Sequence, residues 1–337
     1  MAAQQPPLIF VDDEFPGITR RRSGKGWAYH DPHGTLIRDP VEKRRLDAVA
    51  LPPAYVDAWF CPAPNGHILA TGMDAKGRKQ YRYHPQFRAT REGEKFDGCL
   101  AFGKLLPLVR RRVERDLTLP GIGKDRAIAS VVRLLDLGAL RIGNEGYARD
   151  NKSFGATTLR NRHARVSGGK VLLKYRGKSG KMQEVTLTDK RLAACVRQMH
   201  DLPGQHLFQW QEADGTLHEV SSACVNQWLA ETMGEPYTAK NFRTWHASAL
   251  AFRLLAEARE VMPLKAVLDE VAAHLGNTPA VTRRSYIHPA VIALVGEQAE
   301  WRARLQLPRA TRWLDKYERG LLAHLEQAPA ALDLLAA

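Results

Sequence analysis

The chain has 337 residues, enough for two domains or one large domain, each with its own core. Its 50 Lys and Arg residues exceed its 36 Asp and Glu residues, and the resulting net charge of +14 favours a polyanionic partner, either nucleic acid or an anionic membrane surface. A hydrophobic content of 44% without a long biased tract predicts a folded globular protein, and no apolar run approaches the ~20 residues of a membrane span.

The N-terminal sequence lacks the basic start and apolar core of a signal peptide, so we expect a soluble intracellular protein. The cysteines are scattered without metal-ligand spacing and are typical of small buried residues in a reducing compartment. They are Cys61, Cys99, Cys195 and Cys224. His30 and His33 are separated by two residues, but no Cys or carboxylate cluster joins them, so we expect chemistry without a metal or a cofactor.

Residues 1–90 alternate short aromatic and β-branched segments with turns rich in Pro, Gly, Asn and Asp, which predicts a small, mostly antiparallel sheet. In residues 78–84, alternation places Tyr81 and Tyr83 on one face with Lys79, and Gln80 and Arg82 on the other. Such a face suits contact with a nucleic-acid groove, although a solvated sheet edge explains it equally well.

Helical periodicity dominates from residue 91 onward. Residues 100–117 and 124–138 carry apolar side chains at helical spacing, with Gly138 as the predicted stop of the second helix. The segment after that stop, Arg141-Ile-Gly-Asn-Glu-Gly-Tyr147, is more polar than a connector requires. We therefore predict an α+β protein with a boundary between residues 85 and 98, a β-rich domain at 1–90 and a mainly helical domain at 91–337.

Residues 151–183 contain nine Lys or Arg residues and no acid. Two strand-like segments flank Gly177-Lys-Ser-Gly-Lys181 and predict a β-hairpin whose tip carries Lys178. The tip is not a phosphate-binding P-loop, because Leu172 occupies the required upstream glycine position and a strand follows. A lysine on such a tip is usually solvated, but within an acid-free run it favours contact with a phosphate.

Further helices are predicted at residues 190–200, from Lys240 and from Pro263. Lys240 and Arg243 are spaced i and i+3 at a helix start, where backbone donors favour an anion. The last of these helices ends at Gly276, just before Asn277, and Tyr286 follows. The Ala- and Leu-rich end, residues 321–337, is typical of a packing segment or a frayed tail.

In chain order, the groups that suit metal-free phosphoryl transfer are Arg141, Lys178, Arg243, Asn277 and Tyr286. Arginines would hold the non-bridging phosphate oxygens, a lysine would protonate the departing alkoxide, and a phenol surrounded by cations would attack in line. By itself, Tyr286 is better explained as an ordinary half-buried tyrosine on a basic surface, and only the other groups of the chain favour a nucleophile.

Five ordered motifs resemble those of the type IB DNA topoisomerases, in particular the compact poxvirus-like bacterial branch. These motifs are Gly77-Arg-Lys-Gln-Tyr-Arg-Tyr83, Arg141-Ile-Gly-Asn-Glu145, Gly177-Lys178, Lys240-Asn-Phe-Arg243-Thr-Trp and Ser285-Tyr-Ile-His-Pro289. The resemblance covers nearly the whole chain. It implies a topoisomerase IB or tyrosine-recombinase-like catalytic fold and DNA relaxation through a 3′-phosphotyrosyl bond at Tyr286, without ATP or metal.

The resemblance also implies a clamp around duplex DNA, with DNA contacts from Arg78, Gln80, Tyr81, Tyr83, Gly143 and Lys240. We expect a monomer that acts in the bacterial cytoplasm on the nucleoid.

One position departs from the family pattern, because many members have histidine where this chain has Asn277. An amide can donate a hydrogen bond but cannot shuttle a proton, which favours a clamp on the transition state over acid–base work. Two alternatives stay open: a tyrosine recombinase or integrase, and a non-catalytic architectural DNA-binding protein. Recombinases typically show His-x-x-Arg and Leu-Gly-His where this chain has Lys240-x-x-Arg243 and Leu275-Gly276-Asn277.

Overall fold

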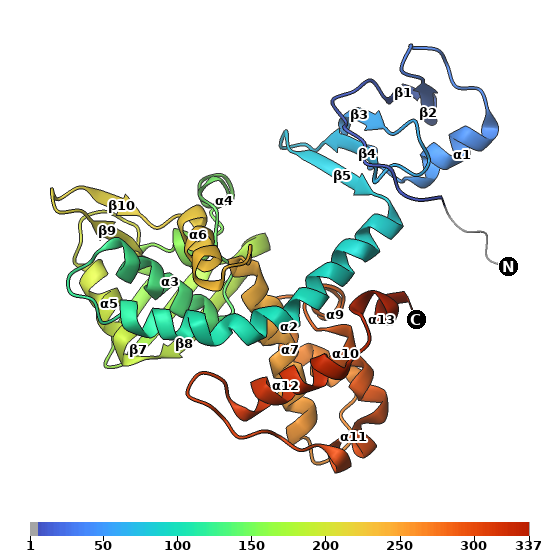
Figure 1. The fold of residues 1–337 in the computed structure, drawn as a ribbon. Coiled ribbons are helices and arrows are strands. Elements are labelled where there is room, and N and C mark those ends of the chain that lie inside the picture. Colours follow the sequence, from blue (N-terminus) through green and yellow to red (C-terminus); the bar gives the residue numbers. More distant parts are fainter. Residues whose placement is uncertain (1–5, 337) are drawn as a thin grey trace. The chain divides into compact units, whose positions relative to one another are not determined.

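The computed structural model describes residues 6–336 and separates the chain into two compact units, of which the first ends at Glu94 and the second begins at Lys95. The first unit contains an antiparallel sheet in the order β2-β1-β3-β4-β5 (Figure 1). Its strands are β1 (Ile18–Ser23), β2 (Gly26–His30), β3 (Val56–Phe60), β4 (Ile68–Met73) and β5 (Lys79–Tyr83). The small antiparallel sheet predicted for the N-terminal region is therefore confirmed.

Helix α1 (Pro40–Ala48) covers this sheet and was not predicted from the sequence. Its signals are present, since the Asp39 side chain accepts a hydrogen bond from the Val41 amide and Pro40 occupies the first turn. Leu46 of α1 packs with Tyr29 and other buried side chains of the sheet to form a small core. Burial of Leu46 and the Asp39 cap explain why so short a helix is stable here.

Strand β5 lies at the edge of the sheet and presents the predicted aromatic face. The rings of Tyr81 and Tyr83 stack with centroids 5.7 Å apart at an interplanar angle of 8°, and the Lys79 ammonium lies 5.8 Å from the Tyr81 ring. The predicted alternation of this strand is confirmed.

The second unit is mainly helical. Helix α2 (Pro85–Asp116) begins in the first unit and continues into the second. The α-helices that follow are α3 (Lys124–Gly138), α4 (Glu145–Asn151), α5 (Lys190–His200), α6 (Ser222–Met233), α7 (Ala239–Glu257), α8 (Leu264–Leu275), α9 (Pro279–Ser285), α10 (Pro289–Ala293), α11 (Gln298–Arg304), α12 (Lys316–Gln327) and α13 (Ala331–Ala336). Buried side chains of α3 and α7, including Val131, Leu135, Trp245 and Phe252, lie at its centre and are fully enclosed. Among residues 6–336, no helix is both long and apolar enough to cross a bilayer.

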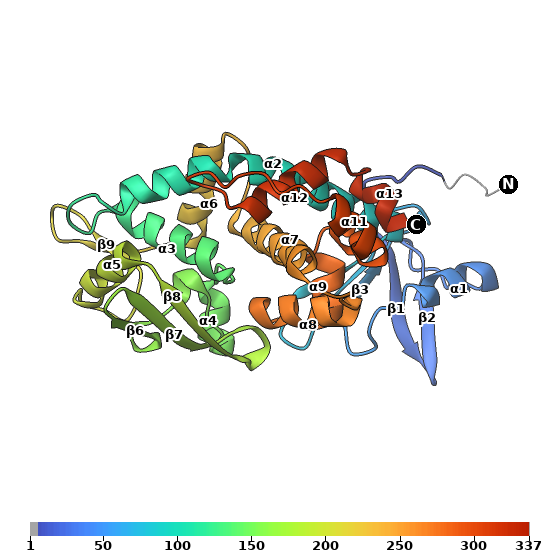
Figure 2. The same ribbon diagram turned by 90° about the horizontal axis from the view of Figure 1, so that it is seen from below.

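A three-stranded antiparallel sheet, in the order β6-β7-β8, stands beside α3 and α5 (Figure 2). Strands β7 (Lys170–Arg176) and β8 (Met182–Thr188) form the predicted hairpin, and β6 (Ala164–Ser167) adds a strand that was not predicted. A second short hairpin, β9 (Gln209–Gln211) with β10 (Leu217–Glu219), lies in a stretch for which no strand was predicted. The larger domain is therefore mainly helical and carries a β-hairpin, as predicted.

The end of α3 corrects one detail of the prediction. The helix does end at Gly138, but the left-handed residue that stops it is Ala139, with φ of 47°. Gly138 is needed for packing instead, because a Cβ there would lie 2.3 Å from the Leu140 side chain. The turn also leaves the Ala139 carbonyl free to accept a hydrogen bond from Arg243.

Candidate active site

The five predicted catalytic residues come from five separate segments of the second unit. Arg141 follows α3, and Lys178 sits at the tip of the β7–β8 hairpin. Arg243 lies in the first turns of α7, Asn277 directly follows the α8 C-cap at Gly276, and Tyr286 is the C-cap of α9. Their relation is therefore set by tertiary packing.

Arg243 is the most deeply buried of the five, at 4% exposure. Its guanidinium donates to the carbonyls of Ala139 at 2.5 Å and Leu275 at 2.9 Å, which fixes its plane between the end of α3 and the end of α8. Its Cζ lies 5.0 Å from the centre of the Tyr286 ring, and its Nε is buried without a partner in the described part of the chain. The arginine is therefore oriented by backbone acceptors while one donor stays available.

Arg141 and Asn277 are joined directly, because the Arg141 guanidinium donates to the Asn277 side-chain oxygen. Gly276 adopts φ of 62° and ends α8, and the Asn277 backbone amide then closes the turn on the Ala272 carbonyl at 2.9 Å. With its oxygen occupied, Asn277 can offer only its amide N–H groups to a ligand. That nitrogen is buried and finds no partner within residues 6–336.

The electrostatic surroundings of Tyr286 favour its phenolate. Burial alone would raise the pKa of the phenol, but the positive charge and donor groups of Arg243, and next the charges of Arg141 and Lys178, outweigh it. The pKa of Tyr286 is therefore held below its ordinary value of 10.0. Each of the three cations that act on this phenol belongs to the predicted catalytic set.

The backbone that carries Tyr286 is held from two sides. The Ser248 hydroxyl, on α7 five residues beyond Arg243, accepts a hydrogen bond from the His288 amide at 2.9 Å and lies 3.4 Å from the Tyr286 carbonyl. The Lys95 ammonium donates to the Ser285 carbonyl at 2.9 Å. Neither residue was singled out from the sequence, since a buried serine or a helical lysine carries no local signal of such a contact.

Lys178 is the exposed member of the set, on a tip that the Gly177 amide closes onto the Lys181 carbonyl at 2.7 Å. Ser179 and Gly180 have φ of 60° and 77°, so the tip makes a tight left-handed turn. No ion pair of Lys178 is found within residues 6–336, which leaves its ammonium available to substrate.

The residues predicted to contact DNA fall into both units and differ in their surroundings. In the first unit, Arg78 pairs with Asp74 at 2.6 Å, and the Gln80 amide donates to the same carboxylate at 3.2 Å. The stacked rings of Tyr81 and Tyr83 are 41% and 38% exposed.

In the second unit, Lys240 is exposed on the first turn of α7. Gly143 has φ of 97°, and a Cβ there would lie 2.9 Å from the Thr158 hydroxyl. Only glycine fits that position, so Gly143 shapes the backbone that follows Arg141.

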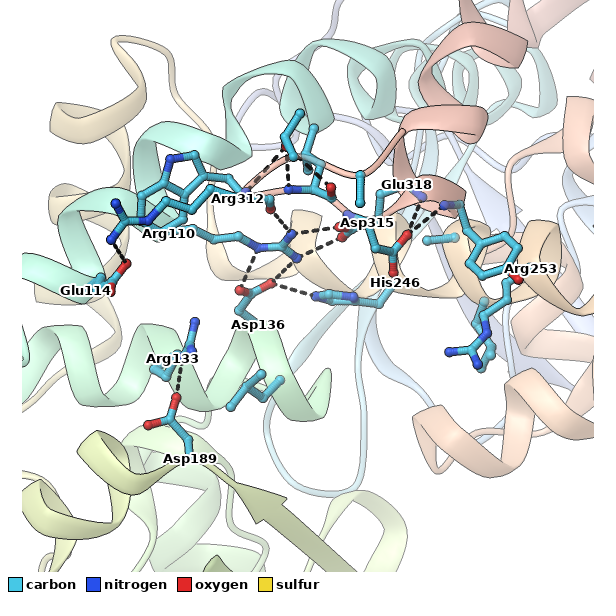
Figure 3. Close-up of a pocket in the computed structure, with 18 of the residues that line it drawn as sticks. Arg110, Glu114, Arg133, Asp136, Asp189, His246, Arg253, Arg312, Asp315 and Glu318 are labelled. Atoms are coloured by element: carbon cyan, nitrogen blue, oxygen red, sulfur yellow. Dashed lines mark hydrogen bonds and ion pairs between the residues drawn. The ribbon is translucent and has the colours of Figure 1, made fainter. Parts of the chain in front are cut away.

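A separate cleft of about 990 Å³ lies among α2, α3, α7 and the segment that precedes α12. At its centre, Arg110 donates to Asp136 at 2.9 Å and to Glu318 at 2.8 Å, and His246 lies 3.2 Å from Asp136 (Figure 3). Here the single Arg110 guanidinium bridges the two carboxylates, and the five predicted catalytic residues do not line the cleft. The cleft is therefore a structural ion-pair network that ties the C-terminal segment to α2 and α3.

One further cluster of acidic and histidine side chains was not noticed in the sequence. It joins Glu145, His206 and Glu219 across three segments. The two carboxylates face different ring nitrogens of His206, and Arg160 contacts both His206 and Glu145. The guanidinium makes this cluster a mixed-charge network that connects α4 to the β9–β10 hairpin.

Most of this chain matches known protein families and individual proteins. Residues 84–305 match the family described as eukaryotic DNA topoisomerase I, catalytic core, and residues 26–74 match the N-terminal domain of bacterial DNA topoisomerase IB. DNA topoisomerase 1B of Acanthamoeba polyphaga mimivirus is 31% identical over 301 residues, which cover 85% of this chain and 89% of the viral protein. DNA topoisomerase 1B of Vaccinia virus (strain Copenhagen) is 19% identical over 242 residues, covering 68% and 73%.

Among solved structures, a XerH site-specific recombinase bound to its difH substrate aligns with a TM-score of 0.34 at 14% identity, covering 63% of this chain and 55% of that one. A score this low establishes no common fold. The catalytic-core match over more than half of the chain, and the 31% identity with a viral relative over most of both chains, show that this chain belongs to the type IB DNA topoisomerase family.

Proposed function

We propose that the protein relaxes supercoiled duplex DNA by cleaving one strand transiently, with Tyr286 as the nucleophile. The observation that carries this proposal is the placement of the Tyr286 ring 5.0 Å from the Arg243 Cζ, where the charges of Arg243, Arg141 and Lys178 lower the pKa of the phenol against the effect of burial. Two buried donors, the Arg243 Nε and the Asn277 amide nitrogen, have no partner in the described chain. A phosphodiester supplies both a negative electrophile for the phenol and acceptors for these donors.

The reaction that these groups support is a reversible transesterification. The Tyr286 oxygen, after losing its proton to solvent, attacks the phosphorus, and the bond from phosphorus to the 5′ oxygen breaks. Arg141, Arg243 and Asn277 stabilise the charge on the non-bridging oxygens, and Lys178 donates a proton to the departing 5′ oxygen. The products are a 3′-phosphotyrosyl bond and a 5′-hydroxyl, and attack by that hydroxyl reseals the strand.

Strand rotation between the two steps changes the linking number. The energy of the phosphodiester is conserved in the bond to Tyr286, so the cycle needs no ATP. The chain itself supplies the nucleophile, the general acid and the oxyanion donors, so no metal is required for any of these roles.

Contacts to duplex DNA are assigned to the remaining predicted residues. The stacked, exposed Tyr81 and Tyr83 offer flat apolar faces beside cationic side chains, and Lys240 offers a charge next to Arg243. We also assign DNA contacts to Arg78 and Gln80, which would have to share or leave the Asp74 carboxylate to make them. Gly143 would contribute through its backbone.

We infer a monomer, because one polypeptide carries all five proposed catalytic groups. We also infer that it acts in the cytoplasm on the nucleoid, where its DNA substrate would lie. Light scattering of the free protein and of its complex with a short duplex tests the monomer directly. A dimer in both states would contradict it.

The function is tested with supercoiled plasmid in EDTA and without ATP. Stepwise relaxed topoisomers are expected from the wild type and none from Tyr286→Phe, which keeps the ring and removes only the nucleophile. Detergent quenching is expected to leave wild-type protein attached to a 3′ end. A mobility shift without a change in linking number would indicate an architectural DNA-binding protein, and joined or exchanged segments would indicate a recombinase.

A further inference from the structure

Gln183 occupies an unusual position at the start of β8. It pairs in register with Tyr175 of β7, on the sheet face whose later β8 members are the apolar residues Val185 and Leu187. That face packs against the protein interior, where an apolar residue is the ordinary choice. A half-buried glutamine there needs a local explanation.

The explanation lies in two glycines that the Gln183 side chain touches. A Cβ built on Gly276 would lie 2.3 Å from the Gln183 Oε1, and one built on Gly177 would lie 2.9 Å from its Cγ. Gln183 is thus in close contact with the backbone of the hairpin tip and with that of the turn after α8. Any side chain at either glycine would have to displace it.

Each of these glycines directly precedes a proposed catalytic residue, since Gly177 leads into Lys178 and Gly276 into Asn277. Below the tip, the Phe154 amide donates to the Arg176 carbonyl at 2.8 Å, and the tip itself is closed by an internal bond. Gln183 therefore supplies a contact between the Lys178 hairpin and the segment that holds Asn277 and leads to Tyr286.

We propose that Gln183 is a positioning residue that docks the Lys178 hairpin onto the Asn277 turn, so that the ammonium is held within reach of the departing 5′ oxygen. This inference rests on the proposed function, in which Lys178 is the general acid. A general acid must lie within hydrogen-bond distance of the atom that it protonates, and misplacement by about 1 Å can cost about 10²-fold in rate. The contact is one of packing, so the length of the Gln183 side chain matters more than its amide.

The test compares two leaving groups in single-turnover cleavage. One duplex carries the ordinary scissile phosphate, and the other carries a 5′-bridging sulfur in place of the 5′ oxygen. A thiol has a pKa of about 8.5, so a thiolate leaves without being protonated and does not need the lysine. A defect that acts through Lys178 is therefore suppressed by sulfur, whereas a general loss of structure affects both substrates.

We expect Gln183→Ala to cleave the oxygen substrate about 10- to 100-fold more slowly than the wild type. On the sulfur substrate its rate should lie within about threefold of the wild-type rate, because the lysine is bypassed. Gln183→Met keeps the side-chain length without the amide and should restore most of the oxygen rate. Glu184→Gln is the matched control on the outward face of the same strand, where Glu184 pairs with Lys174, and should leave both rates unchanged.

Lys178→Ala separates failure of this inference from failure of the proposed function. If sulfur does not rescue Lys178→Ala, Lys178 is not the general acid, and both the role assigned to it and the inference are overturned. If sulfur rescues Lys178→Ala but Gln183→Ala is equally slow on both substrates, the general acid stands and Gln183 is only structural. Unchanged cleavage by Gln183→Ala would also overturn the inference.

A second variant tests the contact itself. Gly276→Ala places a methyl group where the Gln183 amide lies and adds strain at φ of 62°. The double variant with Gln183→Ala removes the clash but not the strain, so it should cleave the oxygen substrate faster than Gly276→Ala alone. Strictly additive losses would show that the two side chains do not meet, and would overturn the proposal.

Discussion

Replacing Arg243 with lysine tests the central electrostatic argument, because the substitution keeps the charge and removes the planar fork. The wild-type guanidinium donates from two nitrogens to the carbonyls of Ala139 and Leu275, and its Nε has no partner among the described residues. An ammonium is a compact point charge on a different stem and cannot reproduce this geometry. It can hold one or both carbonyls only by turning away from the Tyr286 ring.

The substitution should therefore lower both the cleavage rate and the free energy of unfolding. Loss of one preorganised donor to the transition state typically lowers the rate about 10²- to 10³-fold, equivalent to about 2.7–4 kcal/mol. If one buried carbonyl loses its partner, the free energy of unfolding falls by about 1–3 kcal/mol. The first cost appears in the cleavage rate of folded enzyme, and the second appears in urea denaturation, so the two can be measured separately.

The pH dependence of the cleavage rate should also change in Arg243→Lys. Because the pKa of Tyr286 is held below 10.0 chiefly by Arg243, which counters burial, the phenolate forms at lower pH than in a free tyrosine. If Arg243→Lys moves the positive charge away, the pKa of the phenol rises and the rising limb of the rate shifts to higher pH. The assay is single-turnover formation of the covalent adduct, followed on denaturing gels from pH 6 to 10.

Arg253→Lys is the matched control on the same helix. Arg253 pairs at 3.1 Å with Glu257 at an exposed position, so its replacement should change stability by less than about 1 kcal/mol and leave cleavage unchanged. Cleavage by Arg243→Lys within about threefold of the wild-type rate, with an unshifted pH profile, would refute this role of Arg243.

Four further outcomes are expected. Asn277→His should retain most of the cleavage activity and Asn277→Ala should lose more, because a clamp needs only a donor; equal losses in a single-turnover assay would count against that role. DNA affinity, followed by fluorescence anisotropy, should fall by about 10³-fold or more between 50 and 200 mM salt if roughly six or more phosphates are neutralised, and a shallow slope would contradict so extensive a contact. Tyr81→Ala should weaken DNA binding and leave the cleavage rate at saturating DNA unchanged. A lower cleavage rate at saturating DNA would indicate that Tyr81 contributes to the chemical step. Glu318→Ala should destabilise folding by about 1–3 kcal/mol in urea, because the Arg110 and Trp245 donors lose an acceptor while Arg110 keeps its pair with Asp136. Burial would raise the pKa of Glu318, but Arg110 outweighs it and holds that pKa below 4.5, so this stabilisation is present above pH 4.5 and is lost as the pH falls through the lowered pKa.

Local signals in the sequence predict the regular elements well where a periodic apolar face and clear ends coincide. The helix predicted at 124–138 is α3, and that predicted at 190–200 is α5. Short elements such as α1 and β6 were missed, because a few residues carry too little periodicity and are stabilised by the neighbours that they pack against. The stop of α3 was misassigned for a related reason, since the glycine there serves packing and an alanine adopts the left-handed turn.

The sequence by itself determined which chemical groups this protein has, and the order of its motifs was sufficient to predict its family. Only the tertiary structure decided that Arg141 meets Asn277 across 136 residues of chain and that Arg243 is oriented by a carbonyl 104 residues away. Local propensity acts over a few residues, whereas contacts this distant depend on how whole helices and the hairpin pack on a common core. For the same reason Gln183, Ser248 and Lys95 carry no signal in the sequence and are noticed only where the folded chain brings them against the catalytic segments.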